Sequence, residues 1–247
     1  MSRFFVDKKN ITGGEVIIDS PSDVHHITRV LRLKENAVFD VSDSEEWEYK
    51  VRLTALSKNE VRAKILDKQK FSREPEIGIT LFQAVPKQGK METIIQKSVE
   101  LGVVKIVPFL TSRTMISRDE AAAGKAARWQ KIADEAVKQC RRGVIPEVAS
   151  PKTFHDMAEM LGPAGFDKVI FPFENAAGRT IKDALRELKE KPRALALIIG
   201  PEGGFSEEEA KALTAAGADA VSLGKRILRT ETAGPAAIAM IMYELEL

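Results

Sequence analysis

Two polar loops near the end of the chain carry the residues best suited to chemistry. The first, IIGPEGGFS, spans residues 198–206, and the second, SLGKRILRTETAG, spans residues 222–234. Each loop follows a short apolar run that predicts a buried strand, and each precedes a helical pattern. Open α/β sheets bind ligands at the carboxyl ends of their strands, so we expect both loops to lie at a binding edge.

The first loop brings bare backbone to a surface, because its three glycines and Pro201 leave N–H and C=O groups uncovered. Ser206, followed by three glutamates, predicts a helix N-cap with a capping-box glutamate. The loop lacks the Gly-Lys-Ser/Thr of a P-loop and the G-x-G-x-x-G of a dinucleotide-binding turn, which favours a different cofactor. A tight turn with a helix cap is the alternative for this loop taken alone.

The second loop packs charge against a buried core. Lys225, Arg226, Arg229 and Glu231 lie with two threonines between a short strand and an almost wholly apolar final helix. A few polar groups at the edge of an apolar region are typical of a ligand site.

The two loops together closely resemble the cofactor loops of RsmE-type ribosomal RNA methyltransferases, a branch of the knotted SPOUT superfamily. Three further stretches are similar to that family in the same order: HITRVLR at 26–32, QAVPKQGKMETIIQKSVELGV at 83–103 and WQKIADEAVKQC at 129–140. The resemblance covers almost the whole chain.

This resemblance implies a fold, a reaction and partners. The fold is α/β, with a PUA-like β-barrel RNA-binding domain over residues 1–72 and a trefoil-knotted SPOUT methyltransferase domain with a mostly parallel sheet over 73–247. The reaction is methyl transfer from S-adenosylmethionine to N3 of a specific uridine in 16S ribosomal RNA, within free RNA or the 30S subunit, by a homodimer that needs no metal. A knotted methyltransferase acting on tRNA and a non-catalytic RNA-binding protein with a degenerate cofactor site are the alternatives.

The implied reaction sets demands on the site. N3 lies on the Watson–Crick edge, so the target base must be unpaired or flipped out, and its proton must leave. Glu231 is the first candidate for the base and Glu202 the second, while Arg226, Arg229 and Arg3 are candidates for stabilising the uracil anion or holding phosphates. A salt bridge from Glu231 to Arg229 or Arg226 that organises the loop is the alternative.

Three loops are expected to hold the cofactor, and five of their apolar side chains to sandwich its purine. Those five are Phe171, Ile199, Leu223, Ile227 and Leu228. The full predicted cofactor set is Phe171, Pro172, Phe173, Glu174, Ile199, Gly200, Pro201, Glu202, Gly203, Gly204, Leu223, Gly224, Ile227, Leu228, Arg229, Thr232 and Ala233.

Basic residues predict where RNA binds. Lysine and arginine outnumber aspartate and glutamate by 12 to 6 over residues 86–146, although a solvated helix face would give the same pattern. The predicted RNA-binding residues are Arg3, His25, Arg29, Arg32, Lys87, Lys90, Arg141 and Arg142.

A helix starting at Ser22 would place His25, Arg29 and Arg32 on one face, where they could meet a single ligand. The alternative is that His26, Val30 and Leu33 pack this helix while the arginines are merely solvated. The two adjacent histidines point in different directions, so we expect no metal site.

Composition agrees with a globular protein of one large or two modest domains, since 247 residues with 44% hydrophobic content can bury a substantial core. The single cysteine, Cys140, excludes an intrachain disulfide and is expected to be a buried structural thiol. No apolar run approaches membrane-spanning length, so we expect a cytoplasmic protein.

The elements that must position these residues divide near residues 71–76. Before that point, strands are predicted at 3–6, 15–18, 37–41, 49–55 and 61–66, with one helix at 22–33. After it, strands at 77–84, 105–110, 168–173, 194–199 and 220–223 alternate with helices at 90–101, 121–140, 180–189, 206–216 and 232–245, the pattern of a parallel sheet covered on both faces. Residues 233–242 are apolar on nearly every helical face and must be buried within one subunit or against a partner.

Overall fold

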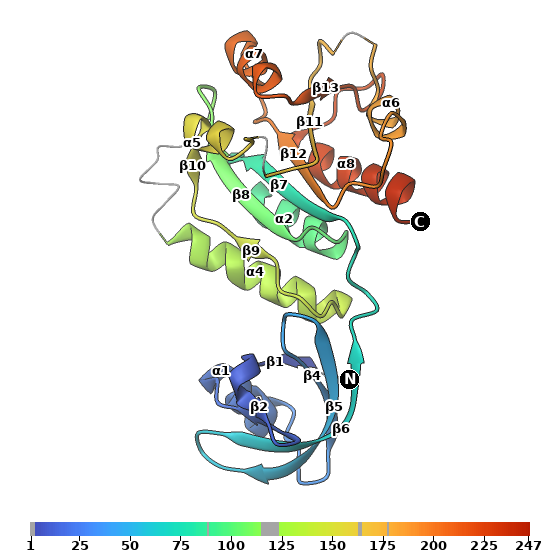
Figure 1. Ribbon diagram of the computed structural model, residues 1–247. Coiled ribbons are helices and arrows are strands. Elements are labelled where there is room, and N and C mark those ends of the chain that lie inside the picture. The colour runs from blue at the N-terminus through green and yellow to red at the C-terminus, as the bar shows by residue number, and fades with distance from the viewer. Residues whose placement is uncertain (1–2, 88, 115–123, 163–164, 177) are drawn as a thin grey trace. The chain divides into compact units, whose positions relative to one another are not determined.

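The computed structural model describes residues 3–87, 89–114, 124–162, 165–176 and 178–247 (Figure 1). The chain forms two compact units. The first comprises Met1–Glu74 together with Val137–Ile145, and the second comprises Pro75–Ala136 together with Pro146–Leu247.

The first unit is built on a six-stranded, mostly antiparallel sheet. Its strands are β1 Arg3–Phe5, β2 Ile11–Thr12, β3 Glu15–Ile18, β4 Val38–Ser42, β5 Trp47–Leu56 and β6 Val61–Lys70, in the order β1-β4-β5-β6-β3-β2. Alternate side chains such as Phe39, Val51 and Leu53 are buried while Lys50 and Arg52 between them are exposed, the period of two that a one-sided core requires. The five predicted strands are confirmed, and the two-residue β2 is an addition.

The predicted helix over 22–33 is only partly right. An α-helix, α1, runs Pro21–His25, and a π-helical turn follows over His26–Val30, closed by a hydrogen bond of 2.9 Å from the Leu31 N–H to the His26 carbonyl. The turn ends at Arg32, whose φ of 50° is left-handed. The wider turn buries Ile27 but leaves Val30 61% exposed, so Val30 does not pack the helix as the alternative interpretation required.

The second unit contains a seven-stranded sheet in which every described pairing is parallel. Its strands are β7 Gly78–Ala84, β8 Lys105–Leu110, β9 Glu147–Val148, β10 Lys152–Thr153, β11 Lys168–Pro172, β12 Ala194–Ile199 and β13 Asp219–Val221. Their order is β10-β8-β7-β12-β11-β13, and β9 also pairs with β8. The predicted α/β class with a mostly parallel sheet is confirmed, whereas the trefoil knot stays a prediction.

Helices cover both faces of this sheet (Figure 1). They are α2 Lys90–Glu100, α4 Lys125–Cys140, α5 Phe154–Glu159, α6 Ile181–Arg186, α7 Glu207–Ala215 and α8 Thr230–Leu245. α8 packs against α2, α6, β7 and β12. Of the predicted helix over 121–140, residues 121–123 lie outside the described part of the chain, and α6 is shorter than the predicted 180–189.

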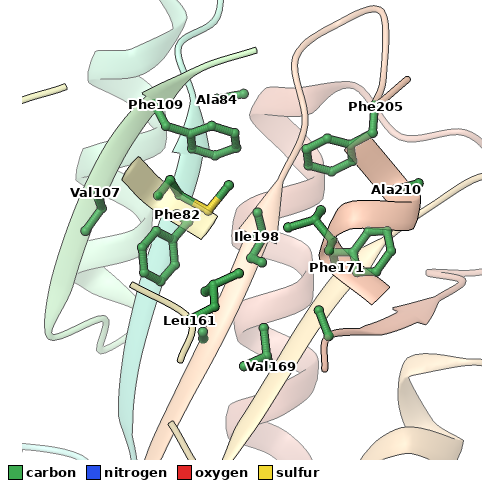
Figure 2. Packing of buried hydrophobic residues seen from close by; sticks show 14 residues of the cluster. Phe82, Ala84, Val107, Phe109, Leu161, Val169, Phe171, Ile198, Phe205 and Ala210 are labelled. Atoms are coloured by element: carbon green, nitrogen blue, oxygen red, sulfur yellow. The ribbon is translucent and has the colours of Figure 1, made fainter. Parts of the chain in front are cut away.

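The opposite face of the sheet carries an aromatic core beneath α5 and α7. Figure 2 shows Phe109, Phe82, Ile198 and Phe171 on four successive strands of the sheet, and Phe205 and Ala210 belong to the same cluster from the α7 side. Phe205 lies edge-on to Phe171 at 5.9 Å between ring centroids. This packing fixes the start of α7 relative to the strand ends.

The parallel register brings the functional loops to one edge. Gln83 of β7 pairs with Ile199 of β12, and Pro172 of β11 pairs with Val221 of β13. The loops that follow β11, β12 and β13 therefore leave the sheet together, as their place after three buried strands predicts. Among the described helices, none has both the length and the apolar character needed to cross a membrane.

Candidate active site and cofactor loops

The glycine loop after β12 is shaped by left-handed backbone and by a helix cap. Gly204 has a φ of +67°, and no heavy atom lies within 4 Å of where its side chain would be. The Ser206 hydroxyl accepts the Glu209 N–H, and the Glu209 carboxylate accepts the Ser206 N–H, so the predicted capping box is confirmed. The loop is thus fixed at its end while its glycines present bare backbone.

Two side chains that sequence reasoning missed hold this loop. Arg113 donates to the Gly203 carbonyl at 2.6 Å and to the Phe205 carbonyl at 3.3 Å. Thr230, the first residue of α8, donates its hydroxyl proton to the Gly200 carbonyl at 2.7 Å. Neither stands near the loop in sequence, so no local pattern indicates the contact.

The two candidate bases share one ammonium group. Lys90 Nζ lies 3.2 Å from Glu202 Oε1 and 3.2 Å from Glu231 Oε2. Glu202 also accepts the Lys87 N–H at 3.0 Å. The salt bridge weighed for Glu231 therefore exists, but its partner is Lys90 rather than Arg226 or Arg229.

These contacts set the protonation states of the cluster. The pKa of Glu231 is lowered, first by its own backbone N–H and then by Lys90 and Arg229, against an opposing effect of desolvation. Desolvation raises the pKa of Glu202, but backbone N–H groups and Lys90 outweigh it, so its net pKa is lowered. Hydrogen bonds to Glu202 and then Glu231 raise the pKa of Lys90. Both carboxylates are ionised and the amine is protonated at neutral pH, which makes either carboxylate a weak base.

Comparisons with known proteins agree with this geometry. A family model described as an RNA methyltransferase domain matches residues 73–242, and one described as an RNA methyltransferase PUA domain matches residues 18–66. The Ribosomal RNA small subunit methyltransferase E of Bacillus subtilis is 32% identical over 253 residues, which cover 100% of this chain and 98% of the relative.

The chain belongs to the ribosomal RNA small subunit methyltransferase E family.

Solved structures of similar proteins extend the match to three dimensions. The methyltransferase E of Neisseria gonorrhoeae, crystallised bound to S-adenosyl methionine, superposes with a TM-score of 0.84 at 33% identity, over 98% of this chain and 97% of that one. A Legionella pneumophila protein solved with the same bound cofactor gives a TM-score of 0.81 at 31% identity, over 98% and 96% of the two chains. The family resemblance and the PUA-type N-terminal domain are confirmed.

Within this methyltransferase fold, the predicted purine sandwich stays a prediction, and its five side chains differ in exposure. The side chains of Phe171 and Ile199 are buried in the sheet, at 0% and 2% exposure. Leu223 and Leu228 are half-buried, and Ile227 is 84% exposed. The apolar composition of the sequence does not distinguish a buried strand end from a pocket wall, so it could not predict these differences.

The other predicted cofactor residues fall into two groups. Pro201 and Ala233 are buried, and Gly200, Pro172, Phe173 and Gly204 are half-buried. The exposed members are Glu174, Glu202, Gly203, Gly224, Arg229 and Thr232. Arg226, predicted to stabilise an anion, is also exposed.

Arg3 and Arg142 make buried contacts within the first unit, and their predicted roles toward the substrate stay predictions. The Arg3 side chain is 7% exposed, pairs with Glu48 and donates to the carbonyls of Arg141 and Arg142 at 2.9 Å each. Arg142 is 4% exposed and pairs with Glu74 at 2.8 Å. Both guanidinium groups are buried and paired with partners inside the protein, and the charge pattern of the sequence cannot show this.

The remaining predicted RNA contacts are accessible. His25, Arg29, Arg32, Lys87 and Arg141 are exposed, and within the described residues no ion pair involves the first three. Lys90 is occupied by the two carboxylates. Across the described ranges no group of three or more His, Cys, Asp or Glu side chains is placed to hold a metal ion.

Proposed function

We propose that this protein transfers a methyl group from S-adenosylmethionine to N3 of a uridine in the ribosomal RNA of the small subunit, in the cytoplasm. The observation that carries the proposal is the cluster of Glu202, Glu231 and Lys90 between the two loops whose sequences resemble the family's cofactor loops. The names of the full-length relatives and the S-adenosyl methionine bound by the Neisseria gonorrhoeae protein support it.

The loops suit this cofactor. Gly204 and Gly224 have left-handed φ values of +67° and +120°, and no atom lies within 4 Å of either missing side chain. A ligand can therefore approach the backbone closely at both loops. Gly200–Gly204, Leu223, Gly224 and Leu228 would hold the cofactor, which supplies an electrophilic methyl group when bound.

The charges of the cluster favour cationic stabilisation of the substrate over proton removal by a carboxylate. N3 of uracil is a weak acid, and its anion needs a partner once the proton has left. Arg229, whose charge acts on Glu231, and Arg226 of the same loop are both exposed and would hold that negative charge. Glu231, whose pKa is lowered, would orient Lys90 and Arg229 rather than accept the proton.

The N-terminal domain over residues 1–72 would bind the RNA, with the methyltransferase domain over 73–247 acting on it. His25, Arg29 and Arg32 are exposed around the π-helical turn, where they can meet phosphates. π-turns are rare and occur often at functional sites. The exposed Lys87 and Arg141 are further candidates.

A homodimer would form through α8. Its exposed side chains recur at the spacing of one helical face: Thr232, Ala239, Met240 and Tyr243 are exposed, and Ala236 between them is half-buried. Tyr243 is 72% exposed and Met240 is 38% exposed. An apolar stripe of this kind on a single chain is suited to a second copy.

The decisive test offers three substrates to the purified protein with S-adenosylmethionine: 30S particles, naked 16S ribosomal RNA and tRNA, each taken from cells that lack this gene. Mass spectrometry of nuclease digests should find 3-methyluridine at one position of the small-subunit RNA. Modification of tRNA alone would establish the other class of knotted methyltransferase. No binding of S-adenosylmethionine by calorimetry would establish the non-catalytic alternative.

A further inference from the structure

Gln83 is a fully buried polar side chain at the carboxyl end of β7. It is 0% exposed, and its neighbours along the strand, Phe82 and Ala84, are equally buried. Burying an amide among apolar groups is unfavourable unless its hydrogen bonds are made. The partners of this amide therefore indicate why the position is polar.

The Gln83 amide begins a directed chain of hydrogen bonds. Its Nε2 donates to Thr230 Oγ1 at 3.0 Å and to the Ala84 carbonyl at 3.0 Å. Thr230 Oγ1 donates its one proton to the Gly200 carbonyl at 2.7 Å, so toward Gln83 it acts as an acceptor. The order of donation is fixed from Gln83 through Thr230 to Gly200.

This relay joins two loops from a third strand. Gly200 opens the glycine loop after β12, and Thr230 immediately precedes Glu231 at the start of α8. Gln83 pairs in register with Ile199, so it lies beside the strand end that leads into Gly200. β7 itself carries none of the residues predicted to touch cofactor or substrate. Gln83 thus connects both loops from a strand that carries neither of them.

The other end of the amide argues against a role in stability alone. Gln83 Oε1 is buried and has no hydrogen-bond partner among the described residues. A side chain at position 234 would begin 3.4 Å from this oxygen, so the oxygen faces the backbone of α8 at Gly234. An unsatisfied buried acceptor costs about 1–3 kcal/mol, so an apolar side chain of the same length would serve folding at least as well.

We infer that Gln83 is a positioning residue, which acts through the Thr230 hydroxyl to set the glycine loop and the start of α8 in the geometry that receives the cofactor. The inference rests on the proposed function. Gln83 is 0% and Thr230 5% exposed, so neither side chain would touch the reacting atoms. Their effect is on the placement of the Gly200 carbonyl and of Glu231.

Four variants test the relay by calorimetric titration with S-adenosylmethionine and by thermal unfolding. Thr230→Val removes the hydroxyl and should raise the Kd about tenfold, whereas Thr230→Ser keeps the hydroxyl and should bind like the wild type. Gln83→Met fills the same space without the amide and should raise the Kd three- to tenfold while the unfolding midpoint stays within a few degrees. Thr80→Val is the matched control. It makes the same substitution as Thr230→Val, at a buried position of β7, and should leave the Kd unchanged.

The double variant of Gln83→Met with Thr230→Val separates a relay from two independent effects. In a relay it should bind no more weakly than Thr230→Val alone, because the second change removes a bond already lost. Additive losses, or wild-type affinity in Gln83→Met, would overturn the inference and leave the proposed function standing. Wild-type protein that binds no S-adenosylmethionine would overturn both.

Discussion

Glu202 and Glu231 are 29 positions apart in the chain and belong to different loops, yet both contact a single ammonium group. Backbone N–H groups and then Lys90 lower the pKa of both carboxylates against desolvation, and hydrogen bonds to both carboxylates raise the pKa of Lys90. Two carboxylates that each lie 3.2 Å from the same ammonium group would repel each other if that group were absent. Lys90 therefore acts as the internal counter-ion of the site, and its removal should disturb the cluster more than the loss of either glutamate.

The roles of Glu231 and the cations can be separated through pH. If the cations stabilise the uracil anion, Glu231→Gln should slow single-turnover methylation less than tenfold, and Arg229→Ala should slow it by about one hundredfold, roughly 2.7 kcal/mol. Raising the pH should not rescue Glu231→Gln preferentially. The measurement is the rate at saturating RNA and cofactor between pH 6 and pH 9.

If Glu231 acts as the base, the expected order of the variant rates is reversed. Glu231→Gln would then be the slower variant, and alkali would restore part of its rate because uracil ionises unaided. Lys90→Met provides a further comparison. Without the ammonium the pKa values of both glutamates should rise, so a carboxylate base would become stronger and the rate would increase.

At the scale of elements, local sequence patterns predicted the bounds of the longer strands well, and they predicted the short or distorted elements poorly. The predicted bounds of β3, β8 and β12 coincide with the observed ones, because each is a mainly apolar run of four to six residues that ends at a charged or polar residue or at a glycine. β9, β10 and α5 have two, two and six residues, too few for a period to show. The π-turn after α1 was not predicted from the sequence, because it adds one residue to a helical turn whose composition is that of an α-helix.

The same contrast holds for the candidate site. The two loops, their place at the strand ends and the capping box followed from sequence, because each depends on neighbouring residues. Lys90, Thr230 and Arg113 did not, because each bonds to a loop far along the chain. The buried side chains of Arg3 and Arg142 show a second limit of sequence-based prediction, because a count of charges does not distinguish paired arginines from exposed ones.

The glycine loop offers a test of close backbone approach. Gly204→Val should lower affinity for S-adenosylmethionine at least one hundredfold, because a β-branched side chain is strained at a φ of +67° and would occupy the open space beside the loop. Gly217→Val is the matched control. Gly217 follows α7 with a φ of +88° and equally open surroundings, but it lies outside the loops. It should lower stability to a similar extent and leave affinity intact.

A buried carboxylate in the β4–β5 turn makes the first unit sensitive to acid. Asp43 is 3% exposed, and its Oδ1 accepts the N–H groups of Glu45, Glu46 and Trp47 at 2.9–3.0 Å. Desolvation raises the pKa of Asp43, but these backbone bonds outweigh it and the net pKa is lowered. Its folded-state pKa is then below the unfolded value, so its stabilisation is present above about pH 4 and is lost as pH falls through the folded pKa.

Asp43→Asn keeps an acceptor oxygen but removes the charge. It should lower the free energy of unfolding by about 1–2 kcal/mol at pH 7. The difference from wild type should shrink as the pH is lowered below about 4, which urea unfolding at several pH values would measure. A pH-independent difference would assign the effect to packing instead. Asp67→Asn, at an exposed position of β6, is the control and should change little.

The π-turn can be tested through the salt dependence of RNA binding. Arg29→Ala with Arg32→Ala should weaken binding to small-subunit RNA and reduce the slope of log K against log salt by about 1–2, because each phosphate contact releases counter-ions. Cofactor affinity should not change. Lys58→Ala with Lys64→Ala removes the same charge from exposed sites of the first unit and should leave the slope nearly unaltered. Equal effects of both pairs would show general attraction without a defined contact.

At the scale of the whole chain, the first unit takes in residues 137–145, which follow it by more than sixty positions. Buried pairs fasten this segment: Arg142 to Glu74, and Arg3 to the carbonyls of Arg141 and Arg142. Ser42 adds a bond from its hydroxyl to the Gly143 carbonyl at 2.5 Å. Gly143 packs directly against the Phe71 ring, which would lie 2.3 Å from any side chain there. Two of the basic residues that suggested an RNA surface serve in this way to hold the chain together.

The last helix, α8, leaves an apolar stripe exposed. α8 is mostly apolar after its first turn, and its inner positions, Ala237, Ile238 and Ile241, are fully buried, whereas Met240 and Tyr243 are exposed. If this stripe meets a second copy, Met240→Glu with Tyr243→Glu should place charges in an apolar interface and weaken dimerisation at least one hundredfold, roughly 2.7 kcal/mol. Sedimentation velocity across a concentration series measures the change. Ala212→Glu with Ala215→Glu, on the exposed face of α7, is the matched control and should sediment as wild type does. A wild-type protein that sediments as a monomer at high concentration, or a dimer unaffected by both pairs, would place the dimer contact elsewhere or remove it altogether.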